Sequence, residues 1–197
     1  GLLCPSGIAA DKGAAPFFRT LSEAVEGRGS RLAALYDFEN RKVFFPDVHA
    51  SFKFCTLVFG NDGRRFPQTR SAFYLHDVAE LAEPQRVLHL SGADFLLLNP
   101  NTGAAPVFRS QRDAELTLAI YRRHPVLVDR SGGSEKRAWP VRYVRMFDMT
   151  NDSHLFLRAR GENCLPLYEG KMVQMYDHRA ADVVVNKDNL HRAAQQE

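Results

Sequence analysis

The first sixty residues order their apolar and polar positions in a way that predicts three strands and one helix. Apolar residues occupy 1–4, and Pro5 with the Ser-Gly pair after it ends this run, which indicates a short buried strand. Apolar side chains then recur at near-helical spacing, which predicts a helix over 14–26. The apolar run 31–38 and the alternating run 51–59 predict two further strands.

This order of elements predicts an α/β fold. A helix between the first two strands is a crossover, which places those strands in parallel. The connection to the third strand is too short for another helical crossover, so that strand is expected to pair antiparallel. Residues 1–60 are therefore predicted to form the edge of an α/β sheet. Because residue 1 is no methionine and already lies in a strand pattern, we expect the chain to be a piece of a larger protein.

The pattern changes after Gly60, where a polar, glycine-containing stretch marks a boundary between segments. Beyond it the sequence predicts a strand that runs into a short helix ended by Pro84. A second short helix has Ser91 as its candidate cap, and a longer helix is capped near Ser110 and ended by Pro125. This middle segment is therefore predicted to be mostly helical.

The longer helix and the region after it carry weaker patterns. Leu116 and Ile120, with Arg123 or His124, fall on one stripe of the helix. From Trp139 onward, short strand-like runs alternate with turns. The last segment is therefore expected to contain the opening strands of another domain.

Composition limits the function classes. The chain has 197 residues and 22.2 kDa, with 45% hydrophobic residues, which is typical of a globular protein with one or two cores. The formal charge of +3 allows only local basic patches and does not by itself identify a nucleic-acid binder. Basic residues outnumber acidic ones between Arg109 and Arg160, which fits either a DNA-facing surface or an ordinary solvated one.

The cysteine pattern and the hydropathy indicate a cytoplasmic protein. Cys4, Cys55 and Cys164 are odd in number, far apart and without metal-ligand spacing, so we expect reduced thiols, no disulfide and no metal site. The histidines show no zinc-ligand spacing either. No apolar run reaches the roughly 20 residues that a membrane span needs, so no membrane partner is expected.

Several long strings of this sequence resemble adenine-specific DNA methyltransferases, most closely the Eco57I-like branch found in large restriction-modification polypeptides of bacterial defence. The first two strings are similar to the closing third of the catalytic domain, and the other three are similar to the region that follows it. The strings are LLCPSGIAAD, LYDFENRKVFFPDVHASFKFCTLVFG, LLLNPNTGAAPVFRSQRDAELTLAIYRRHPVL, RMFDMTNDSHLF and LPLYEGKMVQMYDHR.

The resemblance implies a fold and three segments. Residues 1–60 would be the C-terminal part of a Rossmann-like, S-adenosylmethionine-dependent methyltransferase sheet. Residues 61–138 would be a mostly helical linker, and 139–197 the beginning of the target-recognition domain. In such enzymes the target adenine is flipped out of the duplex, and a loop between the last two strands, usually carrying Phe-Pro, covers one face of the base.

In this sequence that loop is NRKVFFPDVH, so the resemblance implies that Phe45 stacks on the flipped adenine. Pro46 restricts Phe45 to an extended backbone, which helps to present the ring. The alternative is that Phe45 belongs to the core, where we place its neighbour Phe44. Glu39 and Asn40 are expected to shape the turn.

The same resemblance suggests residues for DNA contact. Arg41 and Lys42, in the loop, are candidates for phosphate contact, and the alternative is a solvated turn. Further along, Lys171, His178 and Arg179 are candidates for DNA contact. In the alternative, Glu169, Asp177 and Arg179 pair among themselves and His178 is structural.

The motifs that carry the family's chemistry are missing here. The sequence has no cofactor-binding glycine loop and no Asn-Pro-Pro-Tyr, and the Asn-Pro of LNPNTG is followed by Asn101 instead of a second proline. The resemblance therefore implies that S-adenosylmethionine is the cofactor of the parent protein but does not bind this fragment, which has no catalytic residues of its own.

Two functions remain open. In the first, the chain is a fragment of a DNA adenine methyltransferase that supplies the base-pocket loop, with double-stranded DNA and the rest of the polypeptide as partners. The alternative is a noncatalytic, methyltransferase-like module that binds nucleic acid or another subunit. In both, a truncated sheet exposes an edge through which the chain could self-associate.

Overall fold

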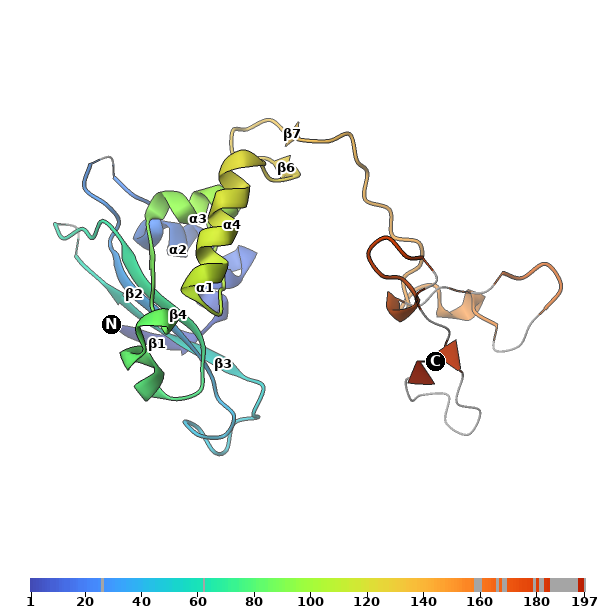
Figure 1. Cartoon of the computed structure of the whole chain (residues 1–197), viewed down its shortest axis with the longest axis horizontal. Helices are drawn as coiled ribbons and strands as arrows, with labels where there is room; N and C mark the ends of the chain where they lie inside the picture. The colour runs from blue at the N-terminus through green and yellow to red at the C-terminus, as the bar shows by residue number, and fades with distance from the viewer. Residues whose placement is uncertain are drawn as a thin grey trace. The chain divides into compact units, whose positions relative to one another are not determined.

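The computed structural model describes residues 1–25, 27–61 and 63–157, and parts of the tail at 161–165, 167, 170–178, 180, 183–184 and 195–196. The chain divides into two units, Gly1–Arg142 and Tyr143–Glu197, and each is described by itself (Figure 1). Within the described residues, no helix combines the length and the apolar character that a membrane crossing requires.

A five-stranded mixed sheet organises the first unit, and its order is β1-β3-β2-β4-β5. The third strand is antiparallel to both of its neighbours, so β1 and β2 run parallel to each other. The predicted parallel pair with an antiparallel third strand is thereby confirmed, as is the α/β class. The strands are β1 (Leu2–Pro5), β2 (Leu32–Glu39), β3 (Lys53–Phe59), β4 (Thr69–Leu75) and β5 (Leu88–Leu90).

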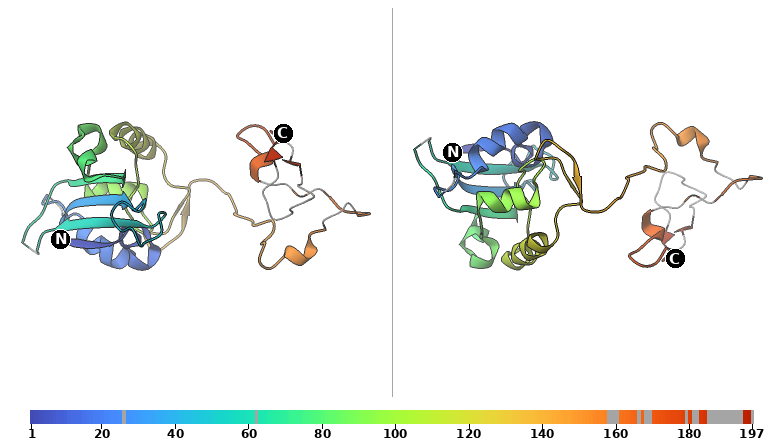
Figure 2. Two further views of the ribbon diagram at one scale, coloured as in Figure 1. Left: turned by 90° about the horizontal axis from the view of Figure 1, so that it is seen from below. Right: turned by 90° about the horizontal axis from the view of Figure 1, so that it is seen from above.

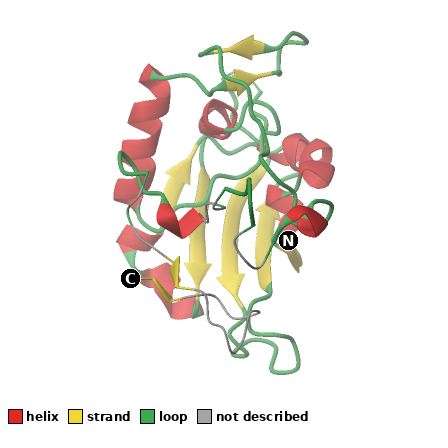
Figure 3. Ribbon diagram, turned by 90° about the vertical axis from the view of Figure 1, so that its right-hand side faces the viewer, coloured by secondary structure: helices red, strands yellow, loops and turns green. Residues whose placement is uncertain are grey.

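The sheet continues across residue 60, the predicted end of the first segment. β4 pairs with β2 in parallel, and β5 pairs with β4 antiparallel, so the segment predicted to be mostly helical contributes two strands to the same sheet. Strand β4 was expected from its apolar run, but its partner was not, because partner choice depends on long-range burial. Figure 3 shows these strands side by side in yellow.

The helices gather beside the sheet (Figures 1 and 2). Instead of one helix over 14–26, the chain forms α1 (Gly7–Ala10), a 3-10 turn η1 (Lys12–Ala14) and α2 (Ala15–Ser22). Helix α2 ends early because Glu23 is extended and Val25 bridges back to Gly29. The φ of +82° at Gly29 is one that glycine tolerates best.

The two predicted later helices are confirmed, with their caps. Ser91 precedes α3 (Gly92–Leu98) and Ser110 precedes α4 (Gln111–Arg123), and each serine hydroxyl accepts the amide of the third residue after it. In place of the short helix predicted after β4, the chain forms two 3-10 elements, η2 (Val78–Ala82) and η3 (Pro84–Arg86). A small hairpin of β6 (Val128–Asp129) and β7 (Lys136–Arg137) follows α4.

Apolar side chains form a cluster on each face of the sheet. The larger cluster holds the helices, with Phe18 of α2 packed edge-on against Phe95 of α3 at 5.9 Å between ring centroids. The smaller cluster joins Phe38, Ala72 and Leu75 to side chains of the β2–β3 loop and of η2. The sheet is therefore covered by helices on one face and by a loop and a 3-10 turn on the other.

Burial differs from the sequence pattern in two elements. The stripe of Leu116 and Ile120 on α4 is largely exposed, at 55% and 47%, and the buried residues of this helix are Ala114 and Leu118. The sequence of α4 carries apolar residues on more than one stripe, and packing selects one. Strand β1 is also less buried than predicted, with Leu3 57% exposed, because β1 is an edge strand of the sheet.

The second unit lacks the strands predicted from 139 onward, as far as the structure describes it. Residues 139–152 form no strand, and Ser153–Leu155 form a 3-10 turn, η4, followed by a second one, η5 (Gly170–Met172). A pair of two-residue strands, β8 (Val183–Val184) and β9 (Gln195–Gln196), completes it. Alternating apolar residues without a partner strand leave backbone groups unpaired, so the pattern alone does not form a sheet.

Candidate functional site

A buried asparagine organises the loop that joins β2 to β3. Asn40 has no exposed surface, its Nδ2 donates to the carbonyl oxygens of Phe45 and Val48, and its Oδ1 accepts the amide of Phe45, all at 2.9 Å. Its own amide donates to the carbonyl of Phe52 across the loop at 2.9 Å. The expectation that Asn40 shapes this turn is confirmed.

The two adjacent phenylalanines in this loop have different surroundings. Phe44 is half-buried and packs against Phe38 and Phe54 at 5.3 and 5.2 Å between ring centroids, so it belongs to the smaller core cluster as predicted. Phe45 is 39% exposed, and among the described rings it contacts only Phe54, nearly perpendicular to it at 5.1 Å between centroids. Pro46 is exposed. Phe45 is therefore partly open to solvent, and its contact with a base remains a prediction.

The turn between Asn40 and Phe44 has an uncommon backbone. Arg41 and Lys42 are exposed and adopt φ of +42° and +62°. Left-handed backbone costs a residue with a β-carbon about 1–2 kcal/mol, and the hydrogen bonds of Asn40 offset that cost. The Nε of Arg41 lies 3.4 Å from a carboxylate oxygen of Glu39.

The later candidates for DNA contact belong to the second unit. His178 is exposed in the second unit, the side chain of Lys171 is not described, and Arg179 lies outside the described residues. Their role in DNA contact stays a prediction.

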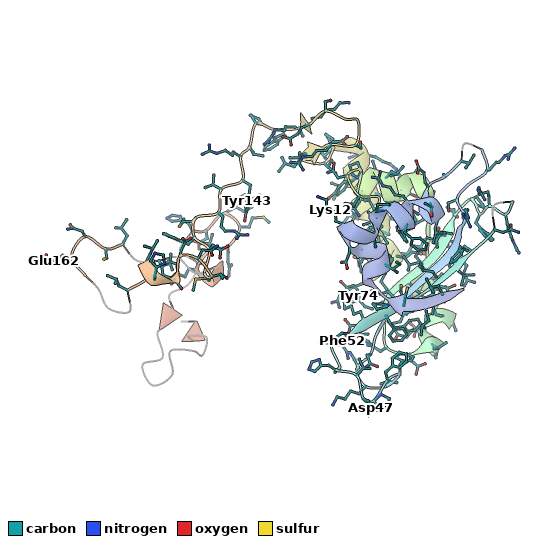
Figure 4. The ribbon with its side chains drawn as sticks, turned by 180° about the vertical axis from the view of Figure 1, so that it is seen from behind. Lys12, Asp47, Phe52, Tyr74, Tyr143 and Glu162 are labelled. Carbon is teal, nitrogen blue, oxygen red and sulfur yellow. The ribbon has the colours of Figure 1, made fainter. Side chains whose placement is uncertain are left out.

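A polar pocket of about 270 Å³ opens where the parallel strands β2 and β4 end. Glu39 is the last residue of β2, and His76 follows the end of β4. Ligand sites of α/β sheets are typically found at the carboxyl ends of parallel strands. Figure 4 draws the side chains and labels Tyr74. The residues that line the pocket are Glu39, Arg41, Tyr74, His76, Glu80, Arg86 and Arg109.

A β-bulge places Tyr74 in this pocket. Between the pairs Tyr36–Ala72 and Phe38–Leu75, two residues of β4 face one residue of β2. Tyr74 has a φ of +54° there, and it packs toward the helix-covered face together with its neighbour Phe73. The bulge thus interrupts the alternation of the strand and aims the tyrosine ring at the pocket.

Basic side chains surround the carboxylate of Glu39. His76 Nε2 lies 2.9 Å from one carboxylate oxygen, and Lys53 Nζ lies 3.3 Å from the other. The hydrogen bond with His76, aided by Lys53, lowers the pKa of Glu39. This carboxylate therefore remains ionised down to more acidic pH than an ordinary glutamate.

Arg86 closes the inner side of the pocket. Its guanidinium donates to the carbonyl oxygens of Phe73, Tyr74 and Arg109 at 2.7 to 3.1 Å and lies 3.0 Å from Glu80. Burial alone would raise the pKa of Glu80, but the backbone amides of His76 and Asp77, with Arg86, hold that pKa below its ordinary value. Arg86 and Glu80 therefore form a neutral structural pair.

The sequence alone does not predict most of this pocket. It indicated Glu39 and Arg41 only for the turn and for phosphate contact, and it did not indicate Tyr74, Arg86 and Arg109. These three side chains converge from β4, η3 and the segment that precedes α4. One signal was available, because polar residues that directly follow a strand are frequent at the ends of parallel sheets. The parallel pairing of β2 with β4 was needed to apply it.

A second, smaller cavity of about 40 Å³ lies between the sheet and α1, and its lining includes Ser6, Asp37 and Cys55. Asp37 is 6% exposed and accepts a hydrogen bond from the hydroxyl of Ser6. Burial raises the pKa of Asp37, and burial with the neighbouring Cys4 raises the pKa of Cys55. Within the described residues, no three His, Cys, Asp or Glu side chains are grouped in a way that could hold a metal ion.

Comparisons with protein-family models, with curated proteins and with solved structures found no match for this chain.

Proposed function

We propose that this chain is the C-terminal part of the catalytic domain of an adenine-specific DNA methyltransferase, together with the beginning of its target-recognition region. Its partner is double-stranded DNA, and its part in the reaction is to supply one wall of the pocket for the flipped adenine. The sequence resemblance suggests the class, and the geometry of the β2–β3 loop supports the role.

The partial exposure of Phe45 carries this proposal. A flipped base has lost its stacking partners, at a cost of a few kcal/mol, and one aromatic ring returns roughly 1–3 kcal/mol per base. Asn40 binds both the amide and the carbonyl of Phe45, so the ring is held in place before a base arrives. Such preorganisation lowers the entropic cost of binding.

The strand order supports the same proposal. The loop with Phe45 and Pro46 joins β2 to the antiparallel β3, as the resemblance implies for the last two strands of the methyltransferase sheet. In this proposal β4 and β5 are additions to that sheet.

The two cavities found among the described residues are poorly suited to S-adenosylmethionine. The smaller one has a volume of only about 40 Å³. The larger one carries an excess of positive charge through Arg41 and Arg109, which disfavours the positive sulfonium of the cofactor. In this proposal, cofactor binding and the transfer step belong to other parts of the parent protein.

The test is base flipping in duplex DNA that carries a fluorescent adenine analogue. We expect Phe45→Ala to weaken the flipping signal roughly tenfold, because stacking on an aromatic side chain contributes roughly 1–3 kcal/mol per base. The same variant in the longer protein should lower the rate of methyl transfer. Phe17→Ala is the matched control, since Phe17 is 43% exposed on α2, outside the loop.

An unchanged flipping signal in a folded Phe45→Ala protein would show that Phe45 is not the pocket wall. If the chain binds DNA without any flipping signal, the alternative of a noncatalytic nucleic-acid-binding module gains support instead. Circular dichroism of each variant separates loss of stacking from loss of fold.

A further inference from the structure

The pocket at the ends of β2 and β4 has an excess of positive charge at its rim. Arg86 and Glu80 neutralise each other on the inner side. Of the other charged residues in the lining, Arg41 and Arg109 are cationic and Glu39 is a carboxylate, and Lys53 lies next to the lining, 3.3 Å from Glu39. The pocket therefore attracts an anion, although Glu39 restricts where that anion can lie.

The Tyr74 ring lies beside two of these cations, and one of them, Lys53, also contacts the carboxylate of Glu39. Lys53 Nζ lies 4.2 Å and the guanidinium carbon of Arg109 lies 4.8 Å from the centroid of the Tyr74 ring. In the part of the chain that the structure describes, Arg109 has no carboxylate partner for its guanidinium. Its donors are available, and the cation–π contact fixes their position.

We propose that this pocket binds a phosphate group. Guanidinium groups match the oxygens of a phosphate with two parallel hydrogen bonds, and Arg109 and Arg41 come from different elements on the rim. The lysine adds a third, point-like charge. The left-handed backbone at Tyr74 and at Arg41 concentrates local strain around the same pocket, as is common at binding sites.

The source of the phosphate follows if the proposed function holds, and this step rests on it. Glu39 and Arg41 line the pocket, and Asn40 between them holds the loop of Phe45. Phe45 is four positions after Arg41, so their backbones lie at most roughly 14 Å apart. The pocket is then within reach of a backbone phosphodiester close to the flipped adenine. A phosphorylated small molecule is the other source of the same chemistry.

The first experiment tests the pocket with inorganic phosphate alone, by calorimetry or by chemical-shift perturbation of the full chain. We expect Arg109→Gln and Arg41→Gln each to weaken phosphate binding about tenfold or more, because a hydrogen bond to a charged group contributes about 1.5–3 kcal/mol. Both side chains are exposed, so both variants should fold. Arg112→Gln is the control, an exposed arginine of α4 outside the pocket lining. Equal phosphate binding by all of these proteins would overturn the proposal.

The second experiment measures how duplex DNA binding depends on salt. If a phosphodiester occupies the pocket, Arg109→Gln should reduce the slope of log K against log salt by about 0.9, the value for one lost phosphate contact, while the slope for Arg112→Gln stays that of the unmodified chain. Phosphate binding that needs Arg109, with an unchanged DNA slope, would support the small-molecule source and reject the phosphodiester. Loss of the flipping signal in Phe45→Ala is measured separately, so the two proposals can fail independently.

Discussion

At the scale of single residues, the pKa values of two carboxyl groups, Asp37 and Glu39, are shifted in opposite directions. Burial raises the pKa of Asp37, so its contribution to the free energy of unfolding is fully present below its ordinary value of 3.8 and is lost as pH rises through the folded pKa. The hydrogen bond with His76 lowers the pKa of Glu39, whose contribution is present above 4.5 and is lost as pH falls through the folded pKa.

Asp37→Asn is expected to increase the free energy of unfolding at pH 7. The amide keeps an oxygen that can accept from Ser6, and it removes a charge that burial disfavours. Stability should also fall less in the variant than in the unmodified protein as pH rises above 3.8. Urea unfolding at several pH values checks both effects, with Asp47→Asn as the exposed control. The same pH dependence in both proteins would contradict the assignment.

At the scale of elements, caps and a bulge position the pocket. Helix α4 begins at Gln111, two residues after Arg109, and Ser110 between them is its cap. The bulge of β4 turns Tyr74 toward Arg109. The start of α4 and the bulge of β4 therefore determine the distance between the guanidinium of Arg109 and the ring of Tyr74.

Ser110→Ala is expected to destabilise the first unit by about 1 kcal/mol, since its hydroxyl accepts the amide of Asp113 and alanine cannot. Ser110→Asp retains an acceptor at the cap and should unfold close to the unmodified protein. Urea denaturation of the three proteins is the measurement. If both variants lose the same stability, the serine acts through packing and not as a cap.

At the scale of the whole molecule, the sheet presents an edge. Within the described residues, β1 is an edge strand of the sheet, because it pairs with β3 on one side only. Leu2 and Leu3 on this strand are 41% and 57% exposed. An edge strand with exposed apolar side chains is a surface for pairing with another strand.

We expect the 197-residue chain to self-associate through β1, and Leu3→Lys to reduce the association, because a lysine on an edge strand disfavours strand addition. Sedimentation velocity over a range of concentrations measures the change. Val107→Lys is a control, since Val107 is 45% exposed and lies outside the sheet. A protein that stays monomeric at all concentrations would contradict the prediction.

Local sequence determined much of this protein by itself. Helices α3 and α4 begin after Ser91 and Ser110 because a serine hydroxyl satisfies an amide in the first turn, which needs only neighbouring residues. The antiparallel β3 followed from a connection too short for a helix. The packing of Phe44 against the smaller core cluster was also predicted from the sequence.

Tertiary structure decided the rest, because those features depend on contacts between distant residues. The pairing of β4 with β2 brings Tyr74, Arg86 and Arg109 to Glu39, and no spacing along the chain predicts that meeting. Packing against the sheet chose Leu118 over Leu116 on α4, since both are equally apolar and only one stripe can be buried. Sequence thus selected the local turns and caps, while the free energy of burying distant surfaces together determined the sheet order and the pocket.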